Sequence, residues 1–147
     1  MMNTNTIEVL LDAYQKAHAD RDEVALGELY EEDAVICDLA PPLVRNGFGQ
    51  SAIKEWFETW DGPVRMELRD EKTHRTHDLA VVATLVRVTG SKKGEEHDLW
   101  TRATFVLRNS ENKWLIAHEH SSVPFHMDGS LRAAIDLAPP GDFYDRT

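Results

Sequence analysis

Apolar residues follow a helical spacing in three stretches of the first 60 residues. The first covers residues 7–18, where apolar and aromatic side chains recur every three or four positions and Asn5 is placed to cap the helix. A shorter stretch covers 24–30 and has Asp22 as its cap. A third, over 53–60, repeats the pattern with aromatic residues. The spacing therefore predicts three helices.

Beyond these helices the pattern changes to that of strands. Residues 64–69 alternate between apolar and charged, which is typical of a strand with one buried face. Residues 79–89 are nearly all apolar or β-branched, which predicts a central strand covered on both faces. Turn residues separate two further strands, 97–108 and 114–123, and a short apolar run at 34–39 predicts one between the last two helices. Helices followed by an antiparallel meander indicate an α+β fold.

Composition narrows the class of protein. The 147 residues, of which 41% are hydrophobic, are enough for one domain with a core of its own, and we expect residues 1–147 to form it, with an irregular tail from about 128. A net charge of -10 argues against nucleic acid as a partner. The lone Cys37 cannot form an internal disulfide, and neither a secretory signal nor a long apolar run is present. We expect a cytoplasmic protein that does not bind membranes.

The last two predicted strands carry the candidate chemistry. We assume a register in which Arg108 lies opposite Trp114. The cross-strand pairs are then Thr104 with His118, Arg102 with His120, and Trp100 with Ser122. This face collects an indole, a guanidinium, two imidazoles and two hydroxyls, and such a mixture is typical of a small-molecule pocket. Arg102 would favour an anionic or carbonyl-bearing ligand, because guanidinium pairs with such oxygens.

The opposite face of the same hairpin gives an alternative. It carries Leu99, Phe105 and Leu107 and is plainly apolar, so it could be the face that packs on the helices. The polar set would then lie in solvent or at a subunit interface. Two tryptophans on the polar face, Trp100 and Trp114, favour the pocket, because large aromatic side chains are rarely left in water. Trp56 and Trp60 could shape the far wall of such a pocket.

The closing hairpin also resembles a known family. The stretch from Trp100 to Thr104, a turn, and then Trp114-Leu-Ile-Ala-His-Glu-His-Ser-Ser-Val-Pro-Phe is similar to the closing hairpin of SnoaL-like domains, within the nuclear-transport-factor-2-like superfamily. The order of helices and strands over nearly the whole chain is also that of the family. The resemblance implies a cone-shaped, curved antiparallel sheet wrapped around about three N-terminal helices, enclosing a pocket, often in a homodimer.

Ketosteroid isomerases belong to the same superfamily, and they use a carboxylate base with a tyrosine as an oxyanion donor. Tyr14 and Asp38 fall where the resemblance places these two groups. Asp38 could be desolvated enough to act as a base, or it could simply cap the turn before Pro41. The penultimate strand carries Arg102 and Thr104 where a second, acidic donor would be expected. Steroid isomerisation is therefore not predicted.

The two histidines of the last strand have more than one interpretation. His118 and His120 point the same way and could bind a metal if Asp38 or His126 supplied a third ligand. We predict instead that they act as acid–base or hydrogen-bonding groups, with no metal and no cofactor. An inert packed pair is the remaining alternative.

These observations lead to two hypotheses for function. The first is a small-molecule-binding protein, with catalysis left open, that acts as a cofactor-independent isomerase, cyclase, dehydratase or hydrolase on a small organic substrate. Asp38 or His120 would move the proton, and Tyr14 and Arg102 would stabilise negative charge. The predicted ligand-binding residues are Trp56, Trp60, Trp100, Thr104, His118 and Ser122. The second hypothesis is a non-catalytic binding or dimerisation module, with Leu99, Phe105 and Leu107 at its interface.

Overall fold

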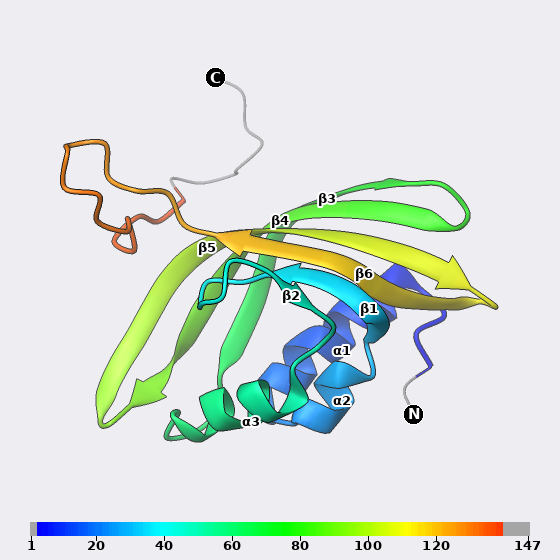
Figure 1. The fold of residues 1–147 in the computed structure, drawn as a ribbon, viewed down its shortest axis with the longest axis horizontal. Helices are drawn as coiled ribbons and strands as arrows, with labels where there is room; N and C mark the ends of the chain where they lie inside the picture. The colour runs from blue at the N-terminus through cyan, green and yellow to red at the C-terminus, as the bar shows by residue number, and fades with distance from the viewer. Residues whose placement is uncertain (1–2, 140–147) are drawn as a thin grey trace.

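Three helices and six strands make up the computed structural model, which describes residues 3–139 (Figure 1). The helices are α1 (Ile7–Ala19), α2 (Glu23–Gly27) and α3 (Gln50–Glu58). The strands are β1 (Tyr30–Cys37), β2 (Arg45–Asn46), β3 (Arg65–Arg75), β4 (Leu79–Lys92), β5 (Glu95–Ser110) and β6 (Lys113–Ser122). The predicted α+β class, with three helices before a four-strand meander, is confirmed.

Helix α1 follows the predicted apolar spacing and buries one face, including Leu10, Tyr14 and His18. Its cap is not the predicted Asn5. The Thr6 side chain accepts a hydrogen bond from the Val9 N–H at 3.1 Å, so the helix begins one residue later than the cap at Asn5 would require. Asp22 caps α2 as predicted, by accepting from the Ala25 N–H at 3.0 Å.

We therefore expect Thr6→Ala to lower the free energy of unfolding by about 1 kcal/mol, because one helix-terminal N–H loses its partner. Asn5→Ala is the matched control and should change it by less than about 0.5 kcal/mol, as is usual for exposed positions. Urea unfolding of both variants measures the difference. Equal losses, or a larger loss for Asn5→Ala, would contradict the assignment of the cap.

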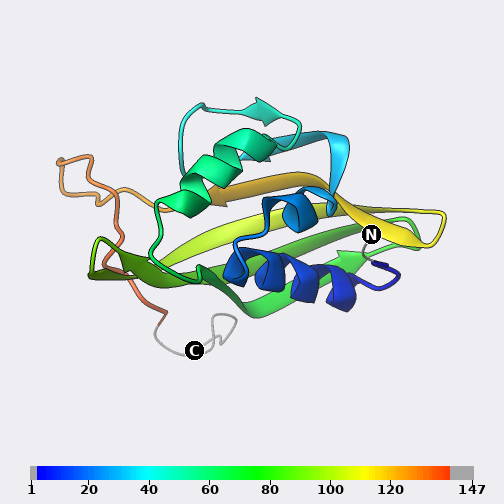
Figure 2. The ribbon, with the colours of Figure 1, turned by 90° about the horizontal axis from the view of Figure 1, so that it is seen from below.

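The six strands form one curved sheet in the order β2-β1-β6-β5-β4-β3. All neighbouring pairs are antiparallel except β1 with β6, which run parallel. Figure 2 shows that the helices lie on one face of this sheet, and the core is buried between them. Tyr14 of α1 packs edge-on against Phe105 of β5, with ring centroids 5.1 Å apart. We refer to the helix-covered face as the inner face and to the opposite one as the outer face.

Two strands differ from their predicted form. Tyr30, predicted at the end of the second helix, begins β1, because α2 ends at Gly27. Strand β4 was predicted to be covered on both faces, which is wrong for the single chain. Its inner face is buried, but Leu79 and Val81 on the outer face are 41% and 36% exposed. The run of β-branched residues therefore reflects strand propensity together with burial on one face.

A close approach fixes the end of α3 against the sheet. A Cβ atom added to Gly90 of β4 would lie 2.7 Å from the ring of Trp60, which follows α3. Only glycine leaves room for the indole at this point. The Trp60 ring, 6% exposed, also packs edge-on against Trp56 at 5.7 Å. This contact holds α3 over the inner face, where the helix forms a wall of the site described below.

A β-bulge in β6 changes the register of the closing hairpin. At the start of the strand Asn109 lies opposite Trp114, after the first pair Ser110 and Lys113, which is one position from the predicted pairing. The register shifts again between Ile116 and His118. Beyond the bulge Phe105 lies opposite Glu119. An extra residue in one strand reverses the alternation of its side chains. Trp114 and Ile116 are therefore buried on the inner face, whereas His118 and His120 are on the outer face.

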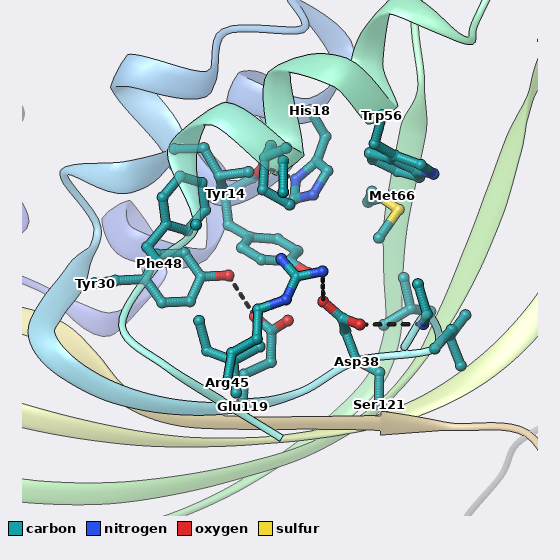
Figure 3. Close-up of a pocket in the computed structure, with 18 of the residues that line it drawn as sticks. Tyr14, His18, Tyr30, Asp38, Arg45, Phe48, Trp56, Met66, Glu119 and Ser121 are labelled. Carbon is teal, nitrogen blue, oxygen red and sulfur yellow. Dashed lines mark hydrogen bonds and ion pairs between the residues drawn. The ribbon is translucent and has the colours of Figure 1, made fainter. Parts of the chain in front are cut away.

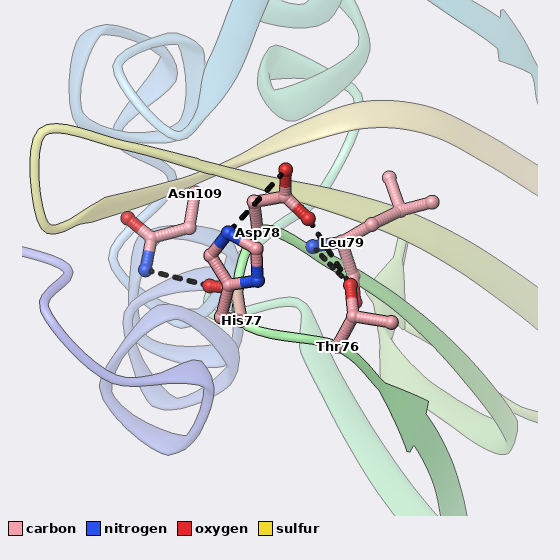
Figure 4. Close-up of polar contacts among 5 residues, drawn as sticks. All are labelled: Thr76, His77, Asp78, Leu79 and Asn109. Atoms are coloured by element: carbon pink, nitrogen blue, oxygen red, sulfur yellow. Dashed lines mark hydrogen bonds and ion pairs between the residues drawn. The ribbon is translucent and has the colours of Figure 1, made fainter.

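The turn between β3 and β4 is held by side-chain and backbone hydrogen bonds (Figure 4). The Thr76 N–H donates to the Leu79 carbonyl at 2.8 Å, and its hydroxyl donates to Asp78 Oδ1 at 3.1 Å. The Asn109 side-chain amide donates to the carbonyl of His77 at 3.5 Å. The His77 side chain itself is 92% exposed.

After β6 the chain leaves the sheet in an irregular segment that continues to residue 139. The tail predicted from about residue 128 also includes residues 140–147, which lie outside the described residues. His126 Nε2 lies 2.6 Å from Asp136 Oδ1, and Phe125 forms a bridge with Ala133. Among residues 3–139, none of the helices has the length and apolar character needed to cross a membrane.

Candidate functional site

A cavity of about 320 Å³ lies between the inner face of the sheet, α1, α3 and the loop after β1 (Figure 3). Its volume is at the lower end of the range for small-ligand pockets. The polar side chains lining it are Tyr14, His18, Tyr30, Asp38, Arg45, Thr101, Glu119 and Ser121. The apolar ones are Leu26, Ile36, Leu39, Ala40, Phe48, Ala52, Ile53, Trp56, Met66, Val86 and Val88. An apolar chamber with a few polar groups is typical of a site for a small organic molecule.

Glu119 of β6 is the most unusual group in this cavity. It is only 6% exposed, and Oε1 accepts a hydrogen bond from the Tyr30 hydroxyl at 2.6 Å. Burial raises the pKa of the Glu119 carboxyl to about 7, against the opposing effect of the Tyr30 hydrogen bond; the nearby Asp38 raises it further. Tyr30 occupies one carboxyl oxygen, so the other can carry a proton and donate it to a ligand.

Asp38 follows β1 and shares the cavity with Arg45 of β2. Asp38 Oδ2 lies 3.7 Å from Arg45 Nη2, and Oδ1 accepts a hydrogen bond from the Ala40 N–H at 3.1 Å. Figure 3 shows the guanidinium directed across the cavity toward the carboxylate. The predicted turn-capping role of Asp38 is therefore present together with its position at the cavity. Because Arg45 is paired with Asp38, these two groups add no net charge to the site.

Tyr14 and His18 reach the cavity from successive turns of α1. Burial raises the pKa of the Tyr14 hydroxyl well above its ordinary value, and the nearby carboxyls Glu119 and Asp38 raise it further. A phenol in this state stays protonated and can donate a hydrogen bond to a ligand. His18 is buried as well, and the structure places it in the cavity wall.

The predicted site residues divide into two groups. Tyr14, Asp38 and Trp56 line the cavity, and Trp60 contacts Trp56 from the core without lining it. The other predicted residues do not line it: Trp100, Arg102, Thr104, His118, His120 and Ser122. These six residues share one face, as predicted, but it is the outer face, because the alternate residues of β5, such as Phe105, pack on the helices. The β-bulge explains only why Trp114, predicted on the same face, is on the inner one. The predicted pairing of Arg102 with His120 is also wrong, since Arg102 lies opposite Ser122 and Thr104 opposite His120.

The outer-face residues have other contacts. Trp100 is half-buried, with the Arg69 and Arg87 guanidinium carbons 5.5 Å and 5.8 Å from the ring. This stacking covers the indole without a pocket. Arg102 Nε donates to Ser122 Oγ at 3.1 Å.

The two histidines of β6, His118 and His120, lie close to each other on the outer face. His118 Nδ1 lies 2.6 Å from the Val35 carbonyl, and the His118 and His120 rings are 6.2 Å apart. The described residues hold no cluster of three His, Cys, Asp or Glu side chains arranged to bind a metal.

The alternative prediction for the hairpin describes its packing correctly. Its apolar face lies on the helices, with Phe105 and Leu107 fully buried and Leu99 packed against the core. These residues therefore cannot form the dimer interface predicted for them, because the chain's own helices cover them. Arg102, which was predicted to favour an anionic or carbonyl-bearing ligand, lies outside the cavity, and the arginine that lines the cavity, Arg45, is paired with Asp38.

Sequence reasoning did not assign six of the polar residues that line the cavity: His18, Tyr30, Arg45, Thr101, Glu119 and Ser121. For Glu119 a signal was present, because it belongs to the apolar face of the hairpin, the face that packs on the helices. A carboxylate on an otherwise apolar face is a candidate for a functional group. Arg45 lies in a two-residue strand that no periodicity reveals.

The arrangement of strands and helices is that of nuclear-transport-factor-2-like proteins. An NTF2-like protein of unknown function from Pseudomonas putida KT2440 matches with 29% identity, a TM-score of 0.80, and coverage of 90% of this chain and 94% of that one. A Xanthomonas campestris protein, provisionally named a calcium/calmodulin-dependent protein kinase II association domain, matches with 27% identity, a TM-score of 0.67, and coverage of 79% and 84%.

A third structure shows the fold alone. It is an NTF2-like protein of Streptomyces avermitilis, provisionally named a dehydratase, with 18% identity, a TM-score of 0.68, and coverage of 79% of this chain and 92% of that one. The family model of the SnoaL-like domain matches residues 7–126. The chain therefore belongs to the SnoaL-like domain family. No curated protein matches it in sequence.

Proposed function

We propose that this protein binds a small, uncharged, largely apolar carbonyl compound and moves a proton at the carbon next to the carbonyl, without a cofactor. The observation that carries the proposal is Glu119, a buried carboxyl with a pKa of about 7 in an apolar cavity that also holds the Asp38 carboxylate and the Tyr14 hydroxyl. Carboxyl groups with separated roles in one pocket are typical of acid–base sites.

Each polar group has a defined part in the proposed reaction. The Asp38 carboxylate takes the proton from the carbon, so the C–H bond breaks and its electron pair moves into the adjoining carbon–carbon bond. Negative charge then develops on the carbonyl oxygen. The Tyr14 hydroxyl and the protonated Glu119 donate hydrogen bonds to that oxygen. Return of the proton from Asp38 to the same or another carbon restores a ketone.

The charges in the cavity favour an uncharged substrate. Asp38 and Arg45 compensate each other, and Glu119 is protonated below pH about 7. A carboxylate or phosphate ligand would find no unpaired cation among the described residues lining the cavity. The apolar walls, including Phe48, Trp56 and Met66, supply the driving force for binding a hydrocarbon skeleton.

The bicyclic ketone 2-tetralone tests the proposal. We expect the protein to accelerate exchange of its α-protons in D2O, followed by proton NMR, and the acceleration to fall as pH rises through about 7, because Glu119 then loses the proton it donates. Arg102→Ala and His120→Ala should leave the rate unchanged, since both side chains lie outside the cavity. Exchange no faster than in buffer would contradict the proposal, and a rate that rises through pH 7 would contradict the role of Glu119.

We also propose that the chain forms a homodimer through the outer face of the sheet. Leu79 and Val81 of β4 are partly exposed there, and the half-buried Val106 of β5 lies opposite Val81. An exposed apolar sheet face of this kind often marks a protein–protein interface. Sedimentation equilibrium should give twice the monomer mass, and Val81→Lys should halve it. A monomer at all concentrations would contradict this part of the proposal.

A further inference from the structure

His18 forms a second polar point in the cavity wall, away from the carboxyl groups. It lies one turn after Tyr14 on α1 and is 5% exposed. Three aromatic rings surround the imidazole, with centroids 4.5 Å away for Tyr14, 5.8 Å for Phe57 and 6.4 Å for Trp56. Figure 3 shows His18 beside the helices and Glu119 beside the sheet, on opposite sides of the cavity.

The hydrogen bond of His18 defines which ring nitrogen carries the proton. Nδ1 lies 2.8 Å from the carbonyl oxygen of Tyr14, and a carbonyl can only accept, so Nδ1 is the donor. Burial lowers the pKa of His18 to about 4, which keeps the ring neutral near pH 7. Nε2 is then an acceptor, and it has no hydrogen-bond partner among residues 3–139. Among the described residues Nε2 is not one of the fully buried unpaired atoms, a set that holds the Trp60 indole N–H, so it is open to the cavity that His18 lines and a ligand there can donate to it.

We propose that the site takes a ligand with two unlike polar ends, a carbonyl toward Glu119 and Tyr14 and a hydroxyl that donates to Nε2 of His18. A flat apolar body along Trp56 would join the two ends. This inference rests on the proposed function for the carbonyl end, and it adds the substrate class: a hydroxylated aryl or polycyclic ketone. Because the neutral imidazole offers a lone pair, it selects a hydrogen-bond donor and disfavours an anion.

Calorimetric titration with three probes tests the inference. The wild type should bind 6-hydroxy-2-tetralone about fivefold more tightly than 2-tetralone, as expected for one added hydrogen bond. It should bind 6-methoxy-2-tetralone no more tightly than 2-tetralone, because the ether has no proton to donate. In His18→Phe, which keeps a ring of similar shape, the preference for the hydroxyl should disappear. In His18→Gln, whose side-chain carbonyl can accept, part of the preference should return.

Three results would overturn the inference. The first is a hydroxyl preference that persists in a folded His18→Phe variant, and the second is equal wild-type affinity for the hydroxy and methoxy probes, a comparison that needs no variant. The third is absence of binding of all three probes to the wild type at millimolar concentration. Failure of the proposed reaction looks different: α-proton exchange would be absent while the His18-dependent preference remained.

Discussion

Replacing Asp38 by Asn is expected to slow the α-proton exchange of 2-tetralone by about 10²- to 10⁴-fold, the usual contribution of a positioned acid or base. The amide keeps the size of the carboxylate and can still accept the hydrogen bond from the Ala40 N–H, but it cannot take a proton from carbon. The affinity for the ketone should change little, because the apolar walls that bind it are untouched. The NMR exchange assay gives the rate, and calorimetry gives the affinity.

The matched control is Asp33→Asn, which makes the same chemical change on the preceding strand β1 at an exposed position. It should leave the exchange rate unchanged. A loss of less than tenfold in Asp38→Asn would show that Asp38 is not the base, and its turn-capping contact would then be its main role.

Replacing Glu119 by Gln is expected to raise the free energy of unfolding at pH 8 by about 3 kcal/mol, and to have little effect at pH 4. The folded chain holds the Glu119 proton up to pH about 7, whereas the unfolded chain releases it near pH 4.5. Between these values the folded state binds more protons, so the wild type loses stability as pH rises. Glutamine removes this loss and can still accept the hydrogen bond from Tyr30.

Urea unfolding of both proteins from pH 4 to pH 8 measures this difference. His18 acts in the opposite direction, because its lowered pKa makes the fold less stable as pH falls from about 6.5 toward 4. That contribution is present in both proteins and cancels in the comparison. Glu32→Gln, at an exposed position of β1, should show no comparable gain. A gain that is the same at both ends of the pH range would contradict a raised pKa for Glu119.

The positions of Tyr14 and Asp38 could be predicted from the sequence, because each lies in or next to a segment with a clear apolar pattern. Helical spacing placed Tyr14 on the buried face of α1, and the end of an apolar run placed Asp38 after β1; both line the cavity. The same reasoning explains the correct prediction of the four-strand meander, because the segments between the strands are rich in residues that favour turns. These features depend on residues that are only a few positions apart in the chain, so a single sequence is enough to predict them.

The rest of the site depends on contacts between distant parts of the chain. One extra residue in β6 reverses the face on which His118 and Glu119 lie, and a bulge of this kind leaves no clear mark in the pattern. The parallel pairing of β1 with β6, with Cys37 opposite His120, brings the end of β1 to Glu119. No spacing between Asp38 and Glu119 in the sequence indicates this proximity.

The choice of face was the avoidable error. Two tryptophans were taken to mark the pocket, but the bulge separates them, and arginine side chains cover Trp100 on the outer face. Phe105 and Leu107 were the better guide, because the most apolar face of a sheet packs on its helices. Following them would have placed Glu119 in the interior.

The central claim is that the cavity holds a carboxyl that is protonated near neutral pH. A carbon-13 NMR titration of protein labelled at glutamate carboxyl carbons tests it most directly, with the Glu119 signal assigned by its loss in Glu119→Gln. We predict that this signal titrates with a pKa of about 7, well above the ordinary value of a glutamate carboxyl. A Glu119 carboxyl that titrates near 4.5 would contradict the account.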